Sequence, residues 1–154
     1  MMKLYLLRHG KADWPNWDKP DDERPLTRKG KKEIRCVARL LCKLKVDSAV
    51  VLSSPLPRAL ETAEIVAKRL GAPLRQERGL GKGLNTAKLR DILKRNKVDE
   101  LMLVGHEPDF SGVIRAVTGG EVKLAKGGIA RIDIEEGQDA GRLIWLLSPK
   151  LAQT

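Results

Sequence analysis

The sequence has few histidines, cysteines and aromatic residues, and each shortage excludes something. Only two of the 154 residues are histidine, and only two are cysteine. Cys36 and Cys42 lie six positions apart in a helical pattern, which turns their side chains roughly 240° from one another. We therefore expect no disulfide, as in proteins of a reducing compartment. With only His9 and His106 available as imidazole ligands, we also expect no metal site.

Long hydrophobic runs are missing as well. No segment approaches the ~20 apolar residues that span a bilayer, and the N-terminus lacks an apolar signal segment. We therefore expect a cytoplasmic protein that has no membrane partner. The length of 154 residues falls within the ~100–200 residues of a typical domain. A hydrophobic content of 42% and a charged content of 32% are ordinary for a globular chain, so we expect a single domain over residues 1–154.

Positive charge, by contrast, is plentiful. Lys and Arg number 30 against 20 Asp and Glu, and the resulting net charge of +10 favours anionic partners such as nucleic acid, acidic proteins or phosphorylated substrates. The basic residues are spread over predicted helices such as "TRKGKKEIR" and "KLRDILKRNK", a distribution typical of a solvated surface. Because these helices contain no aromatic residue for base stacking, we expect no nucleic-acid partner.

Strand and helix patterns alternate along the chain. Residues 3–7, "SAVVLSSP" and "ELMLVGH" are short apolar runs that predict buried strands. A helix is predicted to begin after Thr27, which suits an N-cap, and "RALETAEIVAKRLG" predicts a second helix that Gly71 ends. "TAKLRDILKRN" and "PDFSGVIRAVTGG" predict two more helices, and "IARIDIEEGQDAGRLIWLLSP" predicts a closing hairpin. This order predicts an α/β fold, a three-layer α/β/α sandwich with a mostly parallel central sheet and an antiparallel edge.

Reactive side chains follow three of the predicted strands. Arg8 and His9 follow the first strand, Arg58 lies shortly after the second, and His106 ends the third. The carboxyl ends of parallel strands meet at one edge of the sheet, so these side chains are expected to converge there. Each of them alone has an ordinary structural explanation, as a surface or satisfied residue. Their coincidence at three strand ends indicates a site.

Two arginines and two histidines at one mouth suit phosphoryl chemistry. Guanidinium groups present planar forks of donors that match phosphate oxygens, and they stay charged at any working pH. A neutral histidine nitrogen can attack phosphorus and split one displacement into two through a phosphohistidine intermediate. The arginines and a second histidine, His106, can stabilise the transferred group electrostatically, without a metal or any other cofactor.

Four motifs in order carry a family resemblance over nearly the whole chain: "LLRHGKA", "ERPLTRKG", "LSSPLPRALETAEIV" and "LVGHEPDFS". On these motifs the sequence resembles the histidine phosphatase superfamily, and most closely its SixA-type phosphohistidine phosphatases. The resemblance implies that His9 is the phosphorylated nucleophile, with Arg8, Arg58 and His106 around the phosphoryl group. It also implies that Arg24 lines the same pocket. The implied fold is a minimal phosphoglycerate mutase-like form without lid insertions, which would leave an open, shallow site.

The sequence defines the proton donor less clearly. A departing alkoxide needs a positioned acid, and larger relatives supply one between the second helix and the third strand. Here that segment is "LRQERGLGKGLN", in which Glu77 is the only carboxylate. Asp21, three residues before Arg24, matches an aspartate of the SixA-like pattern and is our candidate, although a solvated loop acid explains it equally well. The alternatives are Asp22, Glu23 and Glu107.

The predicted substrate is phosphohistidine on a protein. An imidazole, whose unperturbed pKa is about 6.5, leaves phosphorus more easily than an alkoxide does, so weak acid machinery suits phosphohistidine better than a sugar phosphate. The open site and the positive surface favour an acidic protein domain as its carrier. The alternatives are a phosphatase of small phosphomonoesters, such as sugar phosphates or nucleotides, and a non-catalytic phosphate-binding protein.

Two loop segments lack the patterns of regular structure. "GLGKGLN" lacks both the G-x-G-x-x-G pattern and the G-K-[ST] ending of a phosphate loop, so we expect a flexible loop there. Trp14 and Trp17 lie in a segment rich in Asp and Pro. We expect them to form a hydrophobic brace over the site, with a contact for a partner as the alternative.

Overall fold

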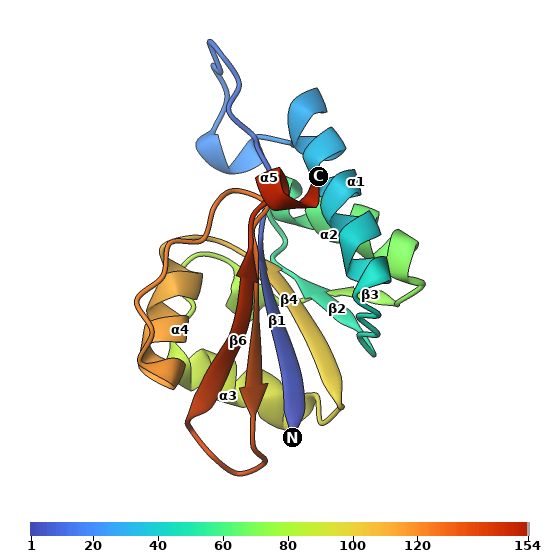
Figure 1. The fold of residues 1–154 in the computed structure, drawn as a ribbon. Helices are drawn as coiled ribbons and strands as arrows, with labels where there is room; N and C mark the ends of the chain where they lie inside the picture. Colours follow the sequence, from blue (N-terminus) through green and yellow to red (C-terminus); the bar gives the residue numbers. More distant parts are fainter. Residues whose placement is uncertain (154) are drawn as a thin grey trace.

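The computed structural model describes residues 1–153. They form a six-stranded sheet in the order β3-β2-β4-β1-β5-β6, with helices on both of its faces (Figure 1). The strands are β1 (Met2–Arg8), β2 (Val51–Ser53), β3 (Leu74–Gln76), β4 (Glu100–Gly105), β5 (Ile129–Ile134) and β6 (Gly141–Leu147). The helices are α1 (Arg28–Lys43), α2 (Pro57–Leu70), α3 (Thr86–Arg95), α4 (Asp109–Thr118) and α5 (Pro149–Ala152), with short 3₁₀ turns η1 (Asp21–Glu23) and η2 (Arg78–Leu80).

The strand directions confirm the predicted sheet. Strands β1 to β4 run parallel, whereas β5 pairs antiparallel with β1 on one side and with the edge strand β6 on the other. The fold is therefore an α/β sandwich with a mostly parallel sheet and an antiparallel edge, as the sequence predicts. Since β4 lies between β2 and β1, the carboxyl ends of these three strands are neighbours.

Two apolar clusters fill the space between the sheet and its helices. Leu4 and Leu6 of β1 belong to the cluster beneath α3 and α4, together with Phe110. Leu7 belongs to the opposite cluster, beneath α1 and α2, together with Ile34. Because helices cover both faces, β1 appears in the sequence as a continuous apolar run without polar alternation.

The predicted helix ends are confirmed. The Thr27 hydroxyl accepts a hydrogen bond from Gly30 N at 3.0 Å, which satisfies one of the free donors at the start of α1. Gly71 ends α2 with a φ of 69°, in the left-handed region that glycine adopts without steric cost. These local signals fix where the helices start and stop, independently of the sheet.

The structure adds elements that the sequence does not predict. Strand β3 has only three residues, two of them exposed, and α5 has four, so neither produces a hydrophobic period long enough to detect. The loop at 79–85, which the sequence predicts to be flexible, is anchored, because Gly83 N and Leu84 N both donate to Asp109 Oδ2. Cys36 and Cys42 are both free, as predicted. Among residues 1–153, no helix combines the length and the apolar character that crossing a bilayer requires.

The tryptophan loop also differs from its prediction. Trp14 is 40% exposed, and its ring contacts that of Trp17 at a centroid distance of 6.3 Å. Each indole donates to a nearby proline carbonyl, Trp14 to Pro25 at 2.8 Å and Trp17 to Pro20 at 3.0 Å. Figure 1 shows this segment projecting beyond the body of the molecule, so the two rings pair with each other and the expected brace over the site is not formed. The Asp- and Pro-rich arm offers no apolar surface for deeper burial.

Candidate active site

The two histidines meet at the carboxyl ends of β1 and β4. Their ring centroids lie 5.3 Å apart, and His9 and His106 are only 8% and 4% exposed. Arg58, in the first turn of α2, is 4% exposed, and its charge acts on both imidazoles. Arg8 ends β1 immediately before His9. The structure thus brings together His9, His106, Arg8 and Arg58, which the sequence predicts to converge at the strand ends.

Backbone contacts fix the position of His9. His9 N donates to Gly105 O at 3.0 Å, and His9 O accepts from Gly127 N at 2.9 Å. The next residue must be small, because a Cβ on Gly10 would lie 2.8 Å from Ile34 Cγ1. Gly10 N in turn donates to the Thr62 hydroxyl of α2 at 3.0 Å. These contacts hold the start of the loop that follows β1 and fix it against α2.

The His9 ring has a defined tautomer. Its Nδ1 lies 2.7 Å from Gly10 O, and a carbonyl oxygen can only accept, so Nδ1 carries the proton. Burial lowers the pKa of His9 to about 3; the hydrogen bond to Gly10 O opposes this shift, and the charges of Arg58 and Arg8 add to it. The ring is therefore neutral at neutral pH, with an unprotonated Nε2. This is the form in which imidazole is a nucleophile.

His106 is held by a residue that the sequence reasoning missed. Its Nε2 lies 2.8 Å from the Ser54 hydroxyl, which is fully buried and also accepts from Leu56 N at 3.2 Å. Burial lowers the pKa of His106 to about 4, with Arg58 contributing, so this ring is neutral too. The Ser54 proton has no other acceptor within residues 1–153, and we assign it to Nε2, which places the imidazole proton on Nδ1. In the sequence, Ser54 stands between a buried strand and a proline, and this pattern predicts only the end of a strand.

Three buried side-chain nitrogens lack a hydrogen-bond partner among the described residues: Arg8 Nε, Arg58 Nε and His106 Nδ1. All three belong to this cluster, and with the tautomer assigned above all three are donors. Buried polar groups in proteins are nearly always satisfied. An oxyanion such as a phosphoryl group, with several acceptor oxygens, would satisfy donors of this kind. The donor set contains no thiolate or carboxylate, and it therefore suits an anion and not a metal ion.

Turn η1 brings Arg24 and Asp21 to the same mouth. Arg58 Nη1 donates to Asp21 O at 3.3 Å, and Arg24 Nη1 donates to Ala12 O at 2.6 Å. Burial lowers the pKa of Arg58, and the neighbouring positive charge of Arg24 lowers it further. The Asp21 carboxylate, 64% exposed, accepts from Arg24 Nε at 2.9 Å and lies 3.9 Å from Lys82 Nζ. Asp21 therefore lies at the rim, with one oxygen already occupied by Arg24.

The alternative acids have other partners. Asp22 forms an ion pair with Lys82, whose hydrogen bond lowers the pKa of that carboxyl. Glu77 accepts from Arg95 and from Gly79 N, both at 2.9 Å, and so anchors the segment after β3. Glu107 Oε1 accepts from Ser111 N at 2.7 Å, at the start of α4. Glu23 lies exposed in η1.

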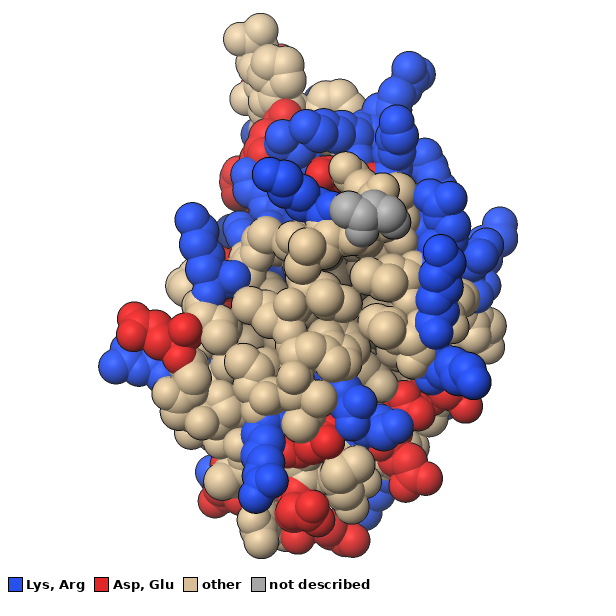
Figure 2. Space-filling view, in the orientation of Figure 1, with Lys and Arg blue, Asp and Glu red and all other residues tan. Residues whose placement is uncertain are grey.

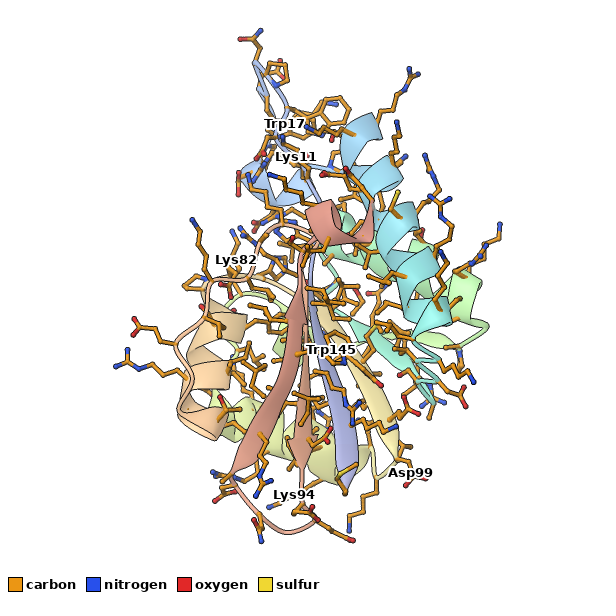
Figure 3. All side chains as sticks on the ribbon, in the orientation of Figure 1. Lys11, Trp17, Lys82, Lys94, Asp99 and Trp145 are labelled. Atoms are coloured by element: carbon orange, nitrogen blue, oxygen red, sulfur yellow. The ribbon has the colours of Figure 1, made fainter. Side chains whose placement is uncertain are left out.

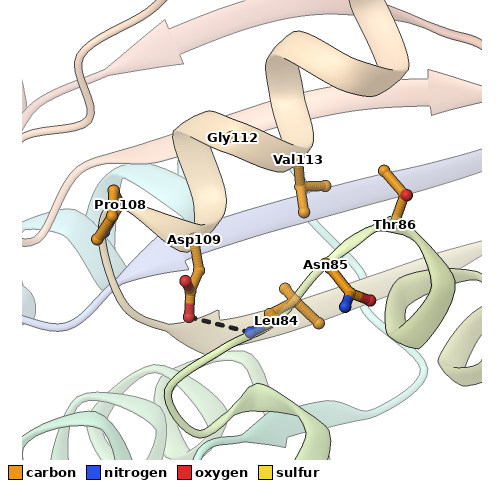
Figure 4. Close-up of a pocket in the computed structure, with 7 residues that line it drawn as sticks. All are labelled: Leu84, Asn85, Thr86, Pro108, Asp109, Gly112 and Val113. Carbon is orange, nitrogen blue, oxygen red and sulfur yellow. Dashed lines mark hydrogen bonds between the residues drawn. The ribbon is translucent and has the colours of Figure 1, made fainter.

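A groove of about 330 Å³ lies beside the loop that follows His106, between the starts of α3 and α4 (Figure 4). Asp109 crosses it to accept from Leu84 N at 3.1 Å. Its lining residues are Leu84, Asn85, Thr86, Pro108, Asp109, Gly112 and Val113. None of them belongs to the histidine and arginine cluster, so the groove is distinct from that cluster.

Comparison with known proteins identifies the family to which this α/β fold belongs. Residues 4–81 match the family described as the histidine phosphatase superfamily (branch 1). The chain belongs to this superfamily. The matched segment contains Arg8, His9, Arg24 and Arg58, whereas His106 lies beyond it.

Two sequence relatives and one solved structure match almost the whole chain. An uncharacterized protein of Picosynechococcus sp. is 35% identical over 97% of this chain and 98% of its own length. The phosphohistidine phosphatase SixA of Escherichia coli (strain K12) is 30% identical over 96% of this chain and 94% of its own length. The structure of the protein histidine phosphatase SixA complexed with tungstate matches with a TM-score of 0.85, at 26% identity over 97% of this chain and 99% of that one. The chain is a phosphatase with a SixA-like, phosphoglycerate mutase-like fold.

Proposed function

We propose that this protein is a metal-independent phosphatase that removes phosphate from phosphohistidine on a protein, through a phosphoenzyme formed on His9. The observation that carries the proposal is the hydrogen bond from His9 Nδ1 to Gly10 O, which leaves Nε2 unprotonated. This Nε2 belongs to the same cluster as three buried donors that have no partner among the described residues. A neutral nucleophile beside fixed donors is the arrangement that transfer of an anionic group requires.

The proposed reaction has two displacements. In the first, His9 Nε2 attacks phosphorus, an N–P bond forms, and the bond to the leaving group breaks with its electron pair going to the leaving nitrogen or oxygen. In the second, water attacks the phosphorylated His9, the N–P bond breaks with its electron pair returning to Nε2, and inorganic phosphate departs. The water gives up one proton to solvent or to the phosphate.

The other members of the cluster stabilise the phosphoryl group in this proposal. Arg8 and Arg58 bind its oxygens as fixed cations, and His106 donates from Nδ1–H without carrying a charge of its own. Arg24 lies at the rim, where it binds the incoming substrate and orients Asp21. Asp21 is our candidate proton donor, needed for an alkoxide and less needed for an imidazole that leaves in its protonated, neutral form.

Two observations support a protein as the substrate. A relative of similar length is named the phosphohistidine phosphatase SixA, and a similar solved structure, of a protein histidine phosphatase also named SixA, contains tungstate, a tetrahedral oxyanion like phosphate. The net charge of +10 favours an acidic partner through long-range attraction. We propose an acidic domain that carries the phosphohistidine.

A substrate comparison tests this function. We expect kcat/KM, measured with EDTA, to be clearly higher for a histidine-phosphorylated protein than for an alkyl or aryl phosphomonoester. We also expect a phosphoenzyme that is labile in acid, stable in alkali, and absent from His9→Ala. A preference for the alkyl ester would indicate a phosphomonoesterase with a dedicated acid. A phosphoryl label that persists in His9→Ala would exclude His9 as the nucleophile.

A further inference from the structure

The solvent face of α1 consists entirely of cations. Every exposed residue of this helix is a lysine or an arginine, namely Arg28, Lys29, Lys31, Lys32, Arg35, Arg39 and Lys43. We call these residues the α1 basic face. None of them forms a salt bridge with another described residue, and the helix contains one acidic residue, the partly buried Glu33. Figure 2 shows the blue side chains gathered along the edge of the molecule that α1 forms in Figure 1.

This arrangement works against the stability of the helix. Its first turn contains basic residues and no acidic residue, although the positive end of the helix dipole favours acidic side chains there. Lys31 and Arg35, and then Arg35 and Arg39, are also one turn apart, where like charges repel. An ordinary solvated helix would mix the two signs. A sequence that breaks two local rules on one face, with no compensating contact, indicates a function for that face.

The first two turns of α1 pack, through their buried side, against the chain that follows His9. Thr27 N donates at 2.9 Å to the carbonyl oxygen of Lys11, which is two residues after His9 in the chain. Gly30 lies so close to the same strand exit that a Cβ there would meet Lys11 O at 2.2 Å. Ile34 packs against Gly10. A macromolecule whose phosphoryl group reaches His9 therefore lies next to the first turns of α1.

We infer that the α1 basic face is the docking surface for an acidic face of the phosphohistidine-bearing protein substrate. The inference rests on the proposed function and names the part of the enzyme that selects the carrier. Arg28, Lys32, Arg35, Arg39 and Lys43 follow one stripe down the helix. At 1.5 Å per residue the stripe is about 22 Å long, comparable to one face of a small helical domain. Charge complementarity of this size speeds encounter and orients the partner.

The composition of the face favours a protein over nucleic acid. Surfaces that bind single strands combine cations with aromatic rings on which bases stack, and α1 contains no aromatic residue. The exposed Trp14 and the partly buried Trp17 pair with each other in the loop before α1 and not on the helix itself (Figure 3 labels Trp17).

Two double variants with the same change of charge test the inference. Lys32→Glu/Arg35→Glu reverses two cations of the α1 basic face, and because both side chains are exposed, the fold is expected to persist. Lys94→Glu/Lys97→Glu reverses two exposed cations that line one groove, and Lys94 lies at the opposite end of the molecule from Lys11 and Lys82 (Figure 3). Turnover is measured with an acidic protein phosphorylated on histidine and with para-nitrophenyl phosphate. The Kd for the phosphoprotein is measured in a His9→Ala background, where no transfer occurs.

For the phosphoprotein we expect kcat/KM to fall, and Kd to rise, roughly tenfold or more in the α1 variant, and we expect both to depend less on salt concentration. In the control variant we expect both quantities to change less than about twofold. Activity on para-nitrophenyl phosphate is expected to be unchanged in both. If both variants lose kcat/KM for the phosphoprotein equally, the effect comes from net charge alone and the inference is overturned. The inference is also overturned if the α1 variant shows no loss. Tighter α1-dependent binding of transfer RNA or of anionic lipid vesicles than of the phosphoprotein would also overturn it.

The same measurements separate the inference from the proposed function. If the wild-type enzyme hydrolyses the phosphoprotein and the α1 variant does so equally well, the proposed function holds and the docking surface is wrong. If the wild-type enzyme does not hydrolyse the phosphoprotein but the His9→Ala protein binds it in an α1-dependent way, the docking surface holds and the substrate assignment is wrong.

Discussion

His106 Nε2 lies 2.8 Å from the Ser54 hydroxyl, and this contact determines which nitrogen of His106 carries its proton. Ser54 and His106 follow the neighbouring parallel strands β2 and β4, 52 positions apart in the chain. The hydroxyl accepts from Leu56 N, and because no other described group accepts its proton, we assign that proton to Nε2. The neutral His106 is thereby kept as an Nδ1–H donor, and Ser54 acts as a positioning residue for it.

Ser54→Ala should therefore lower kcat with little change in KM. Without the hydroxyl, the imidazole is free to take the other tautomer and to present a lone pair to an anionic group. A loss of about 1–2 kcal/mol, roughly tenfold in kcat, is expected. The matched control is Ser53→Ala, since Ser53 is equally buried but its hydroxyl bonds to Ser54 O. Equal effects of the two changes would indicate a structural role for Ser54, and the His106 tautomer can be read directly from ¹⁵N chemical shifts.

Arg58→Met should separate stability from activity. Arg58 is 4% exposed, its Nε has no hydrogen-bond partner among residues 1–153, and its Nη1 donates to Asp21 O at 3.3 Å. Removing a poorly compensated buried charge should raise the free energy of unfolding by about 1 kcal/mol, while loss of a phosphoryl-binding cation should lower kcat/KM by about 10²–10³. The control is Arg69→Met on the exposed side of the same helix, which should change neither. Unchanged kcat/KM in Arg58→Met would place Arg58 outside the site.

Asp21→Asn should distinguish substrates by their leaving groups. If Asp21 protonates an alkoxide, the change should lower kcat/KM for an alkyl phosphate about 10²-fold and leave turnover of phosphohistidine within a few-fold of the wild-type value. The side-chain amide can still accept from Arg24, so the rim contact is kept. Asp22→Asn, one residue along the same turn, is the control. An equal loss on both substrates would assign Asp21 to positioning of Arg24.

The two buried histidines predict how stability depends on pH. Burial lowers the pKa of His9 to about 3 and that of His106 to about 4, from about 6.5 in the unfolded chain. Between these values the unfolded state binds more protons than the folded state, so the free energy of unfolding rises with pH. On acidification below about pH 6.5, each histidine should therefore reduce stability by about 1 kcal/mol per pH unit, until the folded-state pKa is reached. Urea unfolding at pH 7, 6 and 5 measures this slope.

The matched protein for the pH experiment is His9→Asn/His106→Asn. Asparagine does not titrate, so the slope between pH 7 and 5 should largely disappear. The paired carboxyls whose pKa values are lowered, Asp13 and Asp22, affect stability only at more acidic pH, as they become protonated. A slope that persists unchanged in the double variant would show that other groups cause it.

Much of the fold was predictable because its signals are local. Apolar runs of strand length, a threonine that can cap a helix at residue 27 and a glycine that can end one at residue 71 are properties of short segments, and the structure confirms each. Short elements such as β3 and α5 were not predictable, since three or four residues show no period. The arm with Trp14 and Trp17 was mispredicted because burial of an aromatic ring depends on surfaces that the segment itself does not contain.

The sequence was enough to predict the histidines and arginines of the candidate site and the end of the sheet at which they gather, but not Ser54. Only two histidines are present, and parallel strands must present their carboxyl ends together, so topology alone brings His9 and His106 to one edge. The tertiary structure alone decided their chemical state. Whether an imidazole is neutral, and which of its nitrogens carries the proton, depends on burial and on single contacts at 2.7–2.8 Å, to Gly10 O for His9 and to Ser54 Oγ for His106. Such contacts depend on atomic positions that no spacing of residue types specifies.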